Sequence, residues 1–369
     1  MHSALVNRTL DLAVSIQQIP APTFAEQERA VFIQKQFSLA GLEDVCIDSI
    51  GNVYARLPGK GSALPIVISA HMDTVFLAGT NLSIRRTSEK IFGPGIGDNS
   101  LGVAGLSGLL WALQEKWGGQ LPNLPGDLWL VANVCEEGLG DLAGMRAVVD
   151  RFGEQVSAYL ILEGMALGQI YHRGLGVQRY RIEAQTTGGH SWVDFGRPSA
   201  IHELAELITR ITALDLPEDP RTTLNVGVIS GGTTVNTIAA QAQIELDLRS
   251  EGVQELSRLV QQVDTCVKLA DRPDVVMTAR LIGQRPAGEL AQSHPLVKLA
   301  RNALKQVGID AYLGVGSTDA NIPLSLGYPA ICLGLTHGGG AHTVDEYILT
   351  QPVERGLQQL LNVVEGVFI

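Results

Sequence analysis

The sequence has few cysteines and no long apolar run, and both shortages narrow the kind of protein that it can encode. Its four cysteines stand singly, and no pair has CxxC spacing, so we expect reduced thiols rather than disulfides or a zinc ribbon. No apolar stretch approaches the roughly 20 residues that a membrane-spanning helix needs. The start of the chain contains Asp11 and lacks the basic-then-apolar profile of a signal peptide. We therefore expect a soluble, cytoplasmic protein.

Runs of basic residues are also missing. The formal net charge is -11 at pH 7, which argues against a nucleic-acid partner because such a surface needs concentrated Lys and Arg. No internal repeat or low-complexity tract occurs. What the sequence does have is 369 residues, of which 45% are hydrophobic, and this is enough for a large core and two domains.

Apolar segments alternate with amphipathic ones, a pattern typical of a mostly parallel sheet with helices on both faces. Short runs rich in β-branched residues predict strands that are buried on both faces, at 65–70, 127–134, 158–162 and 330–334. Apolar periodicity predicts helices, at 24–40, 100–116, 141–152, 294–307 and 351–364. We thus predict an α/β fold with a mostly parallel mixed sheet.

The middle of the chain follows a different pattern. From residue 174 to 285 the predicted order is β-α-β-β-α-β, which suits a small sheet covered by two helices. Its strands alternate apolar and polar residues, as at Gln243, Glu245 and Asp247, so one face of the sheet is solvated. We predict an α+β domain at 174–285, inserted into a first domain formed by 1–173 and 286–369.

Histidines and acidic residues that could bind a metal follow the predicted strands or lie in glycine-rich loops. They are His71, Asp73, Asp98, Glu136, Glu137, Glu163 and His342. Ligand sites of open α/β sheets lie at the carboxyl ends of the strands. Each residue alone could be a capping or hydrogen-bonding group. The adjacent pair Glu136 and Glu137 favours a cation, because two uncompensated carboxylates after a buried strand would repel each other.

The ordered motifs resemble those of a known family. They are SAHMDTV, GDNSLG, NVCEEGLG, LEG, GGHS and AHTVDEY, and together they extend over nearly the whole chain. Similar motifs occur in the dizinc peptidases and deacylases that include glutamate carboxypeptidase, acetylornithine deacetylase, succinyl-diaminopimelate desuccinylase, aminoacylase and peptidase T. The resemblance implies a catalytic α/β domain interrupted by a lid domain through which two subunits dimerise.

The resemblance also implies two metal sites. Asp98 would bridge two Zn²⁺ ions, with Co²⁺ or Mn²⁺ as possible substitutes. His71 and Glu163 would complete one site, and Glu137 and His342 would complete the other. Carboxylate and imidazole ligands with an open position are typical of catalytic zinc.

Two residues next to these ligands would assist the reaction. Glu136 would remain free of metal and act as the general base towards a metal-activated water. Asp73 would hold the far ring nitrogen of His71. A cis peptide bond between Asp98 and Asn99 is a further implication of the resemblance.

Four residues of the inserted domain match positions that contact substrate in the family. His190 in GGHS would stabilise the oxyanion, either within its own chain or in the site of a partner subunit. Asn236, Arg249 and Arg285 would bind substrate, although either arginine could instead be a solvated strand residue.

We therefore expect a metal-dependent hydrolase that cleaves an amide bond in a small peptide or an N-acyl amino acid. Glu163 favours carboxypeptidase or deacylase action, because the aminopeptidase branch tends to have Asp at this position. Two alternatives stay open at this point. One is a non-catalytic binding protein on the same fold, and the other is a protein with one structural zinc, although such sites are usually rich in cysteine.

Overall fold

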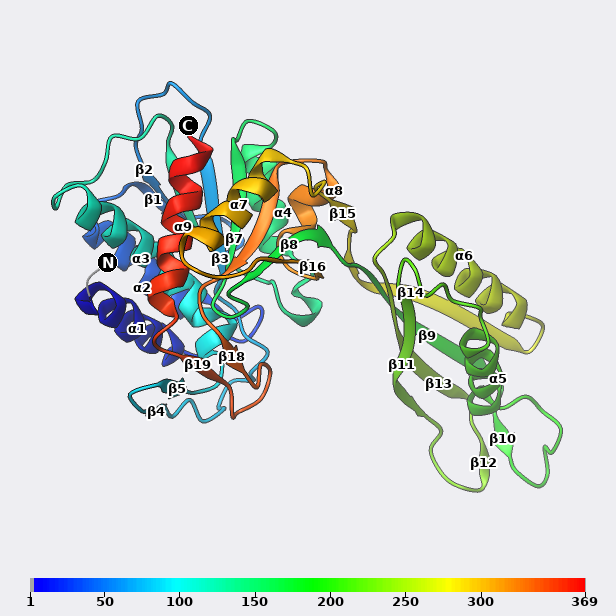
Figure 1. Cartoon of the computed structure of the whole chain (residues 1–369). Coiled ribbons are helices and arrows are strands. Elements are labelled where there is room, and N and C mark those ends of the chain that lie inside the picture. Colours follow the sequence, from blue (N-terminus) through cyan, green and yellow to red (C-terminus); the bar gives the residue numbers. More distant parts are fainter. Residues whose placement is uncertain (1–2, 369) are drawn as a thin grey trace. The chain divides into compact units, whose positions relative to one another are not determined.

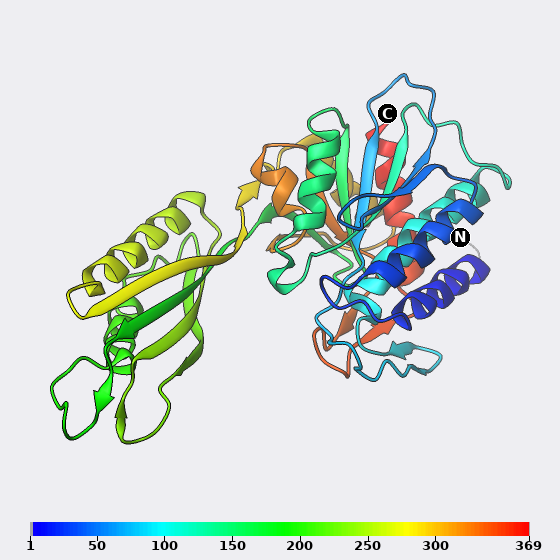
Figure 2. The same cartoon turned by 180° about the vertical axis from the view of Figure 1, so that it is seen from behind.

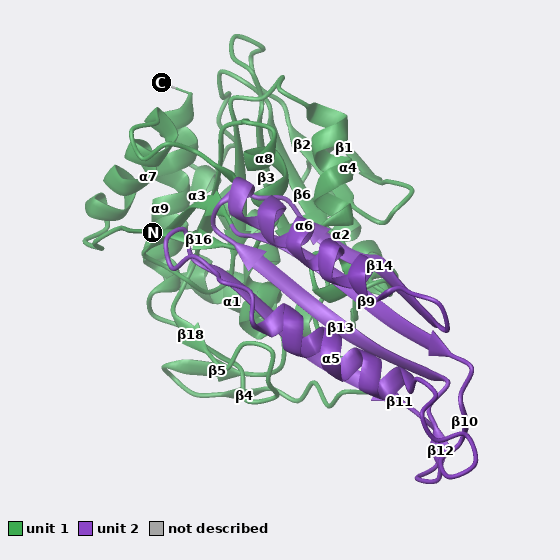
Figure 3. Cartoon of the chain, turned by 90° about the vertical axis from the view of Figure 1, so that its right-hand side faces the viewer, with its two compact units in different colours: residues 1–174, 288–369 green, residues 175–287 purple. Residues whose placement is uncertain are grey.

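The computed structural model describes residues 3–368, and the chain divides into two compact units (Figure 1). Unit 1 comprises residues 1–174 and 288–369, and unit 2 comprises residues 175–287 (Figure 3). The inserted domain expected from the sequence, 174–285, begins one residue before unit 2 and ends two residues before its end. Among residues 3–368, the structure contains no helix with the length and apolar character needed to cross a membrane.

A mixed sheet forms the centre of unit 1, with the strand order β1-β2-β6-β3-β7-β17-β8-β15 and with β16 beside β8. Strands β6, β3, β7 and β17 are parallel neighbours, whereas β1, β2 and β15 pair antiparallel. The strands are β1 (Glu43–Ile47), β2 (Val53–Leu57), β3 (Ile66–His71), β6 (Leu128–Asn133), β7 (Ala158–Glu163), β8 (Gln169–Gly174), β15 (Gly288–Glu289), β16 (Tyr312–Gly316) and β17 (Ala330–Gly334). The mostly parallel sheet predicted from the sequence is confirmed.

Helices cover both faces of this sheet, with α7 and α9 on the face seen in Figure 1 and α4 on the face seen in Figure 2. The long α3 is buried along nearly its whole length, because it packs against α1, α9 and β3. The helices of unit 1 are α1 (Ser3–Gln17), α2 (Gln27–Leu39), α3 (Leu101–Lys116), α4 (Ala143–Phe152), α7 (Pro295–Gln306), α8 (Asn321–Ser325) and α9 (Val353–Val367).

A second, small sheet in unit 1 brings distant segments together. Its order is β18-β19-β5-β4, and its strands are β4 (Arg85–Arg86), β5 (Lys90–Phe92), β18 (Gly338–Gly339) and β19 (Tyr347–Leu349). The pairing of β5 with β19 places the segment before α3 beside the glycine-rich segment that carries His342. The short turn η1 (Ile96–Ser100) links β5 to α3, and the Asp98–Asn99 peptide bond within it is cis, as the resemblance implied.

Unit 2 has its own antiparallel sheet and its own core. The strand order is β11-β13-β9-β14, and α5 and α6 pack against this sheet around a core that includes Ile182, Leu204 and Leu246. The elements are β9 (Gly176–Thr186), α5 (Ala200–Thr212), β11 (Thr222–Gly231), β13 (Gln241–Ser250), α6 (Val253–Ala270) and β14 (Val275–Arg285), with the short pair β10 (Gly189–His190) and β12 (Thr237–Ile238). The order predicted for the inserted segment is therefore confirmed.

Candidate metal centre

The carboxyl ends of four adjacent parallel strands carry most of the candidate ligands. His71 is the last residue of β3, and Glu163 is the last residue of β7. Glu137 follows the end of β6, and His342 follows the end of β17. Because β6, β3, β7 and β17 are neighbours in the sheet, their carboxyl ends meet at one edge.

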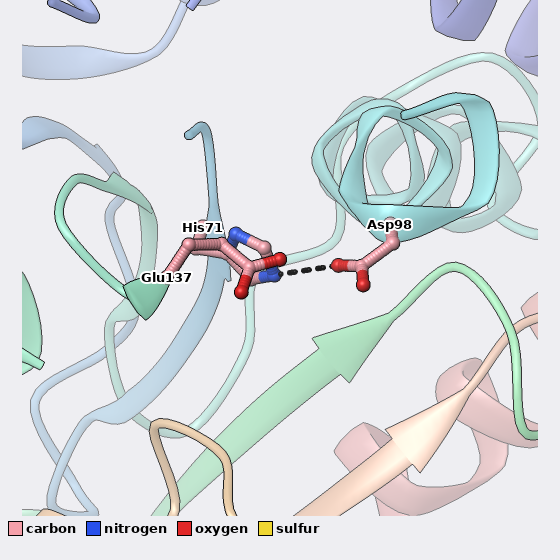
Figure 4. A group of neighbouring side chains, drawn as sticks. All are labelled: His71, Asp98 and Glu137. Carbon is pink, nitrogen blue, oxygen red and sulfur yellow. Dashed lines mark ion pairs between the residues drawn. The ribbon is translucent and has the colours of Figure 1, made fainter. Parts of the chain in front are cut away.

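Asp98 lies between the two histidines. Its Oδ1 is 3.2 Å from Nε2 of His71, and its Oδ2 is 3.1 Å from Nε2 of His342. Nε2 of His342 is also 3.2 Å from Oε1 of Glu137, and Nε2 of His71 is 3.8 Å from Oε2 of Glu163. Figure 4 shows His71, Asp98 and Glu137 directed towards a common point, and one ligand atom from each lies within 4.8 Å of the others.

This donor set fits a pair of divalent cations. Each oxygen of Asp98 faces a different histidine, so one carboxylate can serve two ions at once. Two imidazoles and three carboxylates are the mixed nitrogen and oxygen donors that Zn²⁺, Co²⁺ and Mn²⁺ accept. The five side chains come from separate segments of unit 1, which the central sheet and the small sheet bring together.

The histidines are strongly basic in this environment. Burial acts to lower the pKa of His71, but the carboxylates around it, foremost Asp73 and Asp98, raise it well above its usual value. Hydrogen bonds to Asp98 and Glu137 raise the pKa of His342 to about 10. In the metal-free protein the imidazoles therefore carry the positive charge that cations would otherwise supply.

The carboxylates at the centre differ in their affinity for protons. Burial acts to raise the pKa of Asp98, yet His342 and His71 hold it well below its usual range. Burial raises the pKa of Glu163 to about 7, in spite of the nearby imidazole of His71. A proton can thus compete with a cation at Glu163 near neutral pH.

Asp73 contacts more than the histidine that the sequence paired with it. Nδ1 of His71 is 3.1 Å from the backbone oxygen of Asp73 and 3.4 Å from its Oδ1. The fully buried carboxylate also accepts the backbone N–H groups of Glu136 and Glu137, both at 2.9 Å, and the hydroxyl of Thr23 at 2.9 Å. Asp73 therefore fixes the acidic pair after β6 to the end of β3, a link that the motif alone did not reveal.

Asn99 supports another candidate ligand, Glu163, and sequence reasoning assigned Asn99 no such role. Its Nδ2 donates to the backbone oxygen of Leu162 at 2.8 Å, and its Oδ1 accepts the N–H of Gly164 at 2.8 Å. These two residues flank Glu163. The residue after Asp98 thereby holds the end of β7 against the start of α3, and its place in GDNSLG was the only signal available in the sequence.

The candidate residues of unit 2 form two separate groups, and the first surrounds His190. Its ring is exposed, and its Nδ1 accepts the backbone N–H groups of Trp192 at 3.2 Å and Val193 at 3.3 Å. A neutral imidazole bonded in this way carries its proton on Nε2 and can donate it outward. The backbone oxygen of Asn236 accepts the N–H of Ser191 at 3.1 Å, so Asn236 belongs to the same group.

Arg249 and Arg285 form the second group, at the opposite end of β9. Both are paired with Val177, Arg249 from β13 and Arg285 from β14. Nε of Arg249 donates to Asp247 at 2.6 Å, and Arg285 is only 6% exposed. We call Arg249 and Arg285 the arginine row. At ~3.3 Å per residue along β9, the arginine row is about 30 Å from the His190 group.

Comparisons with known proteins show what the whole chain is similar to. The family model of peptidase family M20/M25/M40 matches residues 67–366. Succinyl-diaminopimelate desuccinylase from Corynebacterium glutamicum is 26% identical over 365 residues, which are 95% of this chain and 94% of that protein. The structure of aminopeptidase PepT from Bacillus cereus has a TM-score of 0.80 and 23% identity, with 98% of each chain covered. A dinuclear metal binding peptidase from Bacillus subtilis has a TM-score of 0.73 and 16% identity, with 100% of this chain and 99% of that chain covered.

Proposed function

Because this chain belongs to peptidase family M20/M25/M40 and is therefore a hydrolytic enzyme, we propose that it cleaves the amide bond of a small peptide or an N-acyl amino acid. The observation that carries the proposal is the position of Asp98, whose two oxygens face His71 and His342 at 3.2 and 3.1 Å. A carboxylate shared in this way is the central feature of a two-metal hydrolytic site.

The five ligands divide into two sets that share Asp98. His71, Asp98 and Glu163 would hold one ion, and Asp98, Glu137 and His342 would hold the other. We propose Zn²⁺ for both sites, with Co²⁺ or Mn²⁺ able to replace it. When bound, the two ions would lower the pKa of a water molecule and polarise the carbonyl group of the substrate.

Glu136 is the proposed general base. It is only 5% exposed, and the hydrogen bond from its N–H to Asp73 fixes its backbone beside the ligands. Its carboxylate accepts a proton from the water whose oxygen attacks the amide carbon. The same proton then passes to the leaving nitrogen as the C–N bond breaks, so Glu136 returns to its starting state.

The substrate carries a free carboxylate in the reaction that we favour, which is carboxypeptidase or deacylase action. Guanidinium groups bind carboxylates through paired hydrogen bonds, and Arg249 and Arg285 stand in one row across β9. Asn236 would bind the substrate from the His190 group. The similarity to a desuccinylase supports deacylation, whereas the likeness to aminopeptidase PepT makes aminopeptidase action the alternative.

His190 is proposed to act in the active site of a second subunit. The chain enters unit 2 beside Val177, so the arginine row lies at the attached end of unit 2 and His190 lies about 30 Å away along β9 at ~3.3 Å per residue. A small substrate cannot contact both groups of one subunit. If both serve the same substrate, one of them comes from a partner copy.

The edge strand β11 offers a surface for this homodimer. It has ten residues and no charged side chain, and Val228 and Ile229 are 46% and 58% exposed. A long, uncharged edge strand tends to pair with another strand. We therefore propose that two copies join through β11 of unit 2, and that the enzyme acts in the cytoplasm, where its free cysteines remain reduced.

A substrate screen tests the function. The purified protein, loaded with Zn²⁺, would be incubated with dipeptides and with N-acetyl, N-succinyl and N-carbamoyl amino acids, and the released amine would be quantified. We expect hydrolysis of at least one class, with loss of activity after metal chelation and in Glu136→Gln. Tight binding of a compound without hydrolysis would indicate the non-catalytic alternative.

A further inference from the structure

Glu346 is a fully buried residue whose carboxylate binds the segment before α3. Its Oε1 accepts the backbone N–H groups of Gly97 at 2.7 Å and Asp98 at 2.8 Å, and its Oε2 accepts that of Gly95 at 3.0 Å. Its backbone oxygen accepts the N–H of Gly93 at 2.9 Å. Donors at a helix start have no partner within the helix, so Glu346 fixes the path of the segment that carries Asp98.

The same residue ends the turn that carries His342. The N–H of Glu346 donates to the backbone oxygen of Thr343 at 3.2 Å. The N–H of Thr343 donates to the backbone oxygen of Gly340 at 3.0 Å. The side chain of His342 is 54% exposed, and its φ is 63°, in the left-handed region that few side chains adopt. Packing therefore contributes little to the position of the His342 side chain. The buried residue Glu346 connects the turn that carries His342 to the rest of unit 1.

The two proposed metal sites depend to different degrees on the hydrogen bonds of Glu346. His71 and Glu163 end β3 and β7, and the ladder of the central sheet fixes their backbones. His342 and Asp98 lie outside the strands, in segments that meet at Glu346. A change at Glu346 therefore alters the spacing of His342 and Asp98 more than that of His71 and Glu163.

We propose that Glu346 is a positioning residue, which holds His342 at the correct distance from Asp98 and so raises the affinity of the site that both form with Glu137. This inference rests on the proposed function only in requiring that two divalent ions bind. A carboxylate suits the position because its two oxygens can accept all three N–H groups. The amide of Gln would instead direct a donor at one of them.

The test compares Zn²⁺ binding by the wild type, Glu346→Gln and a matched control. Zn²⁺ would be titrated against a chromophoric chelator to give a dissociation constant for each ion, without substrate. The control is Asp48→Asn, because Oδ1 of Asp48 also accepts three backbone N–H groups, from Ile50, Gly51 and Asn52, but in the turn between β1 and β2. The visible spectrum of the Co²⁺-loaded protein would report the geometry of the same sites.

We expect Glu346→Gln to weaken one Zn²⁺ by ten- to hundredfold, as is typical when the support of a metal ligand is lost. The other Zn²⁺ should be weakened less, because its site shares only Asp98 with the segments that Glu346 holds. Asp48→Asn should retain both constants. Wild-type constants in Glu346→Gln would overturn the proposal, and so would equal weakening of both ions. If Glu346→Gln does not fold, the same criteria apply to Glu346→Asp, which keeps the charge and shortens the reach.

The outcome for Glu346 can be separated from the outcome for the proposed function. A wild-type protein that binds only one Zn²⁺ would refute the two-metal site itself. A wild-type protein that binds two ions but hydrolyses no amide would refute the activity and leave the positioning role standing.

Discussion

At the scale of single residues, the adjacent acids Glu136 and Glu137 share one backbone support but have different surroundings. Both N–H groups donate to the carboxylate of Asp73. Oε1 of Glu137 is 3.2 Å from Nε2 of His342. This contact is the physical basis for assigning Glu137 to the metal and Glu136 to proton transfer.

Replacing these two acids separately tests that division. Glu136→Gln keeps the shape but cannot accept a proton, so turnover should fall by roughly 10²-fold or more while metal content persists. Glu137→Gln should lower metal content, because it removes a charged ligand. Metal analysis and kinetics on both variants provide the measurement. Equal loss of metal in the two variants would contradict the assignment.

Metal binding should release protons and become tighter as the pH rises. The pKa of His342 is raised to about 10 by Asp98 and Glu137, and burial raises that of Glu163 to about 7. At pH 7 the metal-free site therefore holds protons that must leave before both groups can bind a cation. Each proton released steepens the rise in affinity by about tenfold per pH unit.

Calorimetry checks this linkage. Zn²⁺ would be titrated at pH 6, 7 and 8 in buffers with different ionisation enthalpies, and the number of protons released would be obtained from the dependence of the heat on the buffer. Affinity that does not change with pH, together with no proton release, would show that the site is not protonated in this way.

At the scale of elements, the strands buried on both faces are among the segments that sequence reasoning placed correctly. Every residue of β3 and of β17 is buried, so an unbroken apolar run identifies each strand. The outer strand β1 was not predicted, because its sequence EDVCI is charged and half exposed and its pairing with β2 depends on tertiary context. Helix α1 was likewise missed.

The candidate site shows the same division. Strand ends and motifs identified the proposed ligands, because His71 and Glu163 end buried strands and the others lie in motifs of the family that the sequence resembles. The supporting bonds could not be predicted, since they join remote segments: Glu346 and Asp98 are 248 positions apart. Local patterns contain no information about such a contact.

The edge strand β11 is the element on which the proposed dimer depends. Val228→Lys would place a charge on the exposed edge, so we expect a monomer with a normal metal content and little activity. The matched control is Val276→Lys on β14, at the other edge of the same sheet, because the two valines are 46% and 52% exposed. Light scattering and kinetics would be measured on both. A dimer in Val228→Lys would contradict the role of β11.

At the scale of the whole molecule, the chain contributes two units with different tasks. Unit 1 carries all five proposed ligands and the proposed base, whereas unit 2 carries His190, Asn236, Arg249 and Arg285. The proposed reaction centre thus lies at the edge of the central sheet, and the proposed substrate contacts belong to an inserted unit with its own core. This separation allows a shared hydrolytic centre to act on different substrates.

The most direct test of the central claim is anomalous diffraction at the zinc edge from crystals of the fully loaded protein. The account predicts two peaks in each chain, one on either side of the carboxylate of Asp98, with His71 and Glu163 at one peak and Glu137 and His342 at the other. A single peak, or two peaks that do not share Asp98, would contradict it.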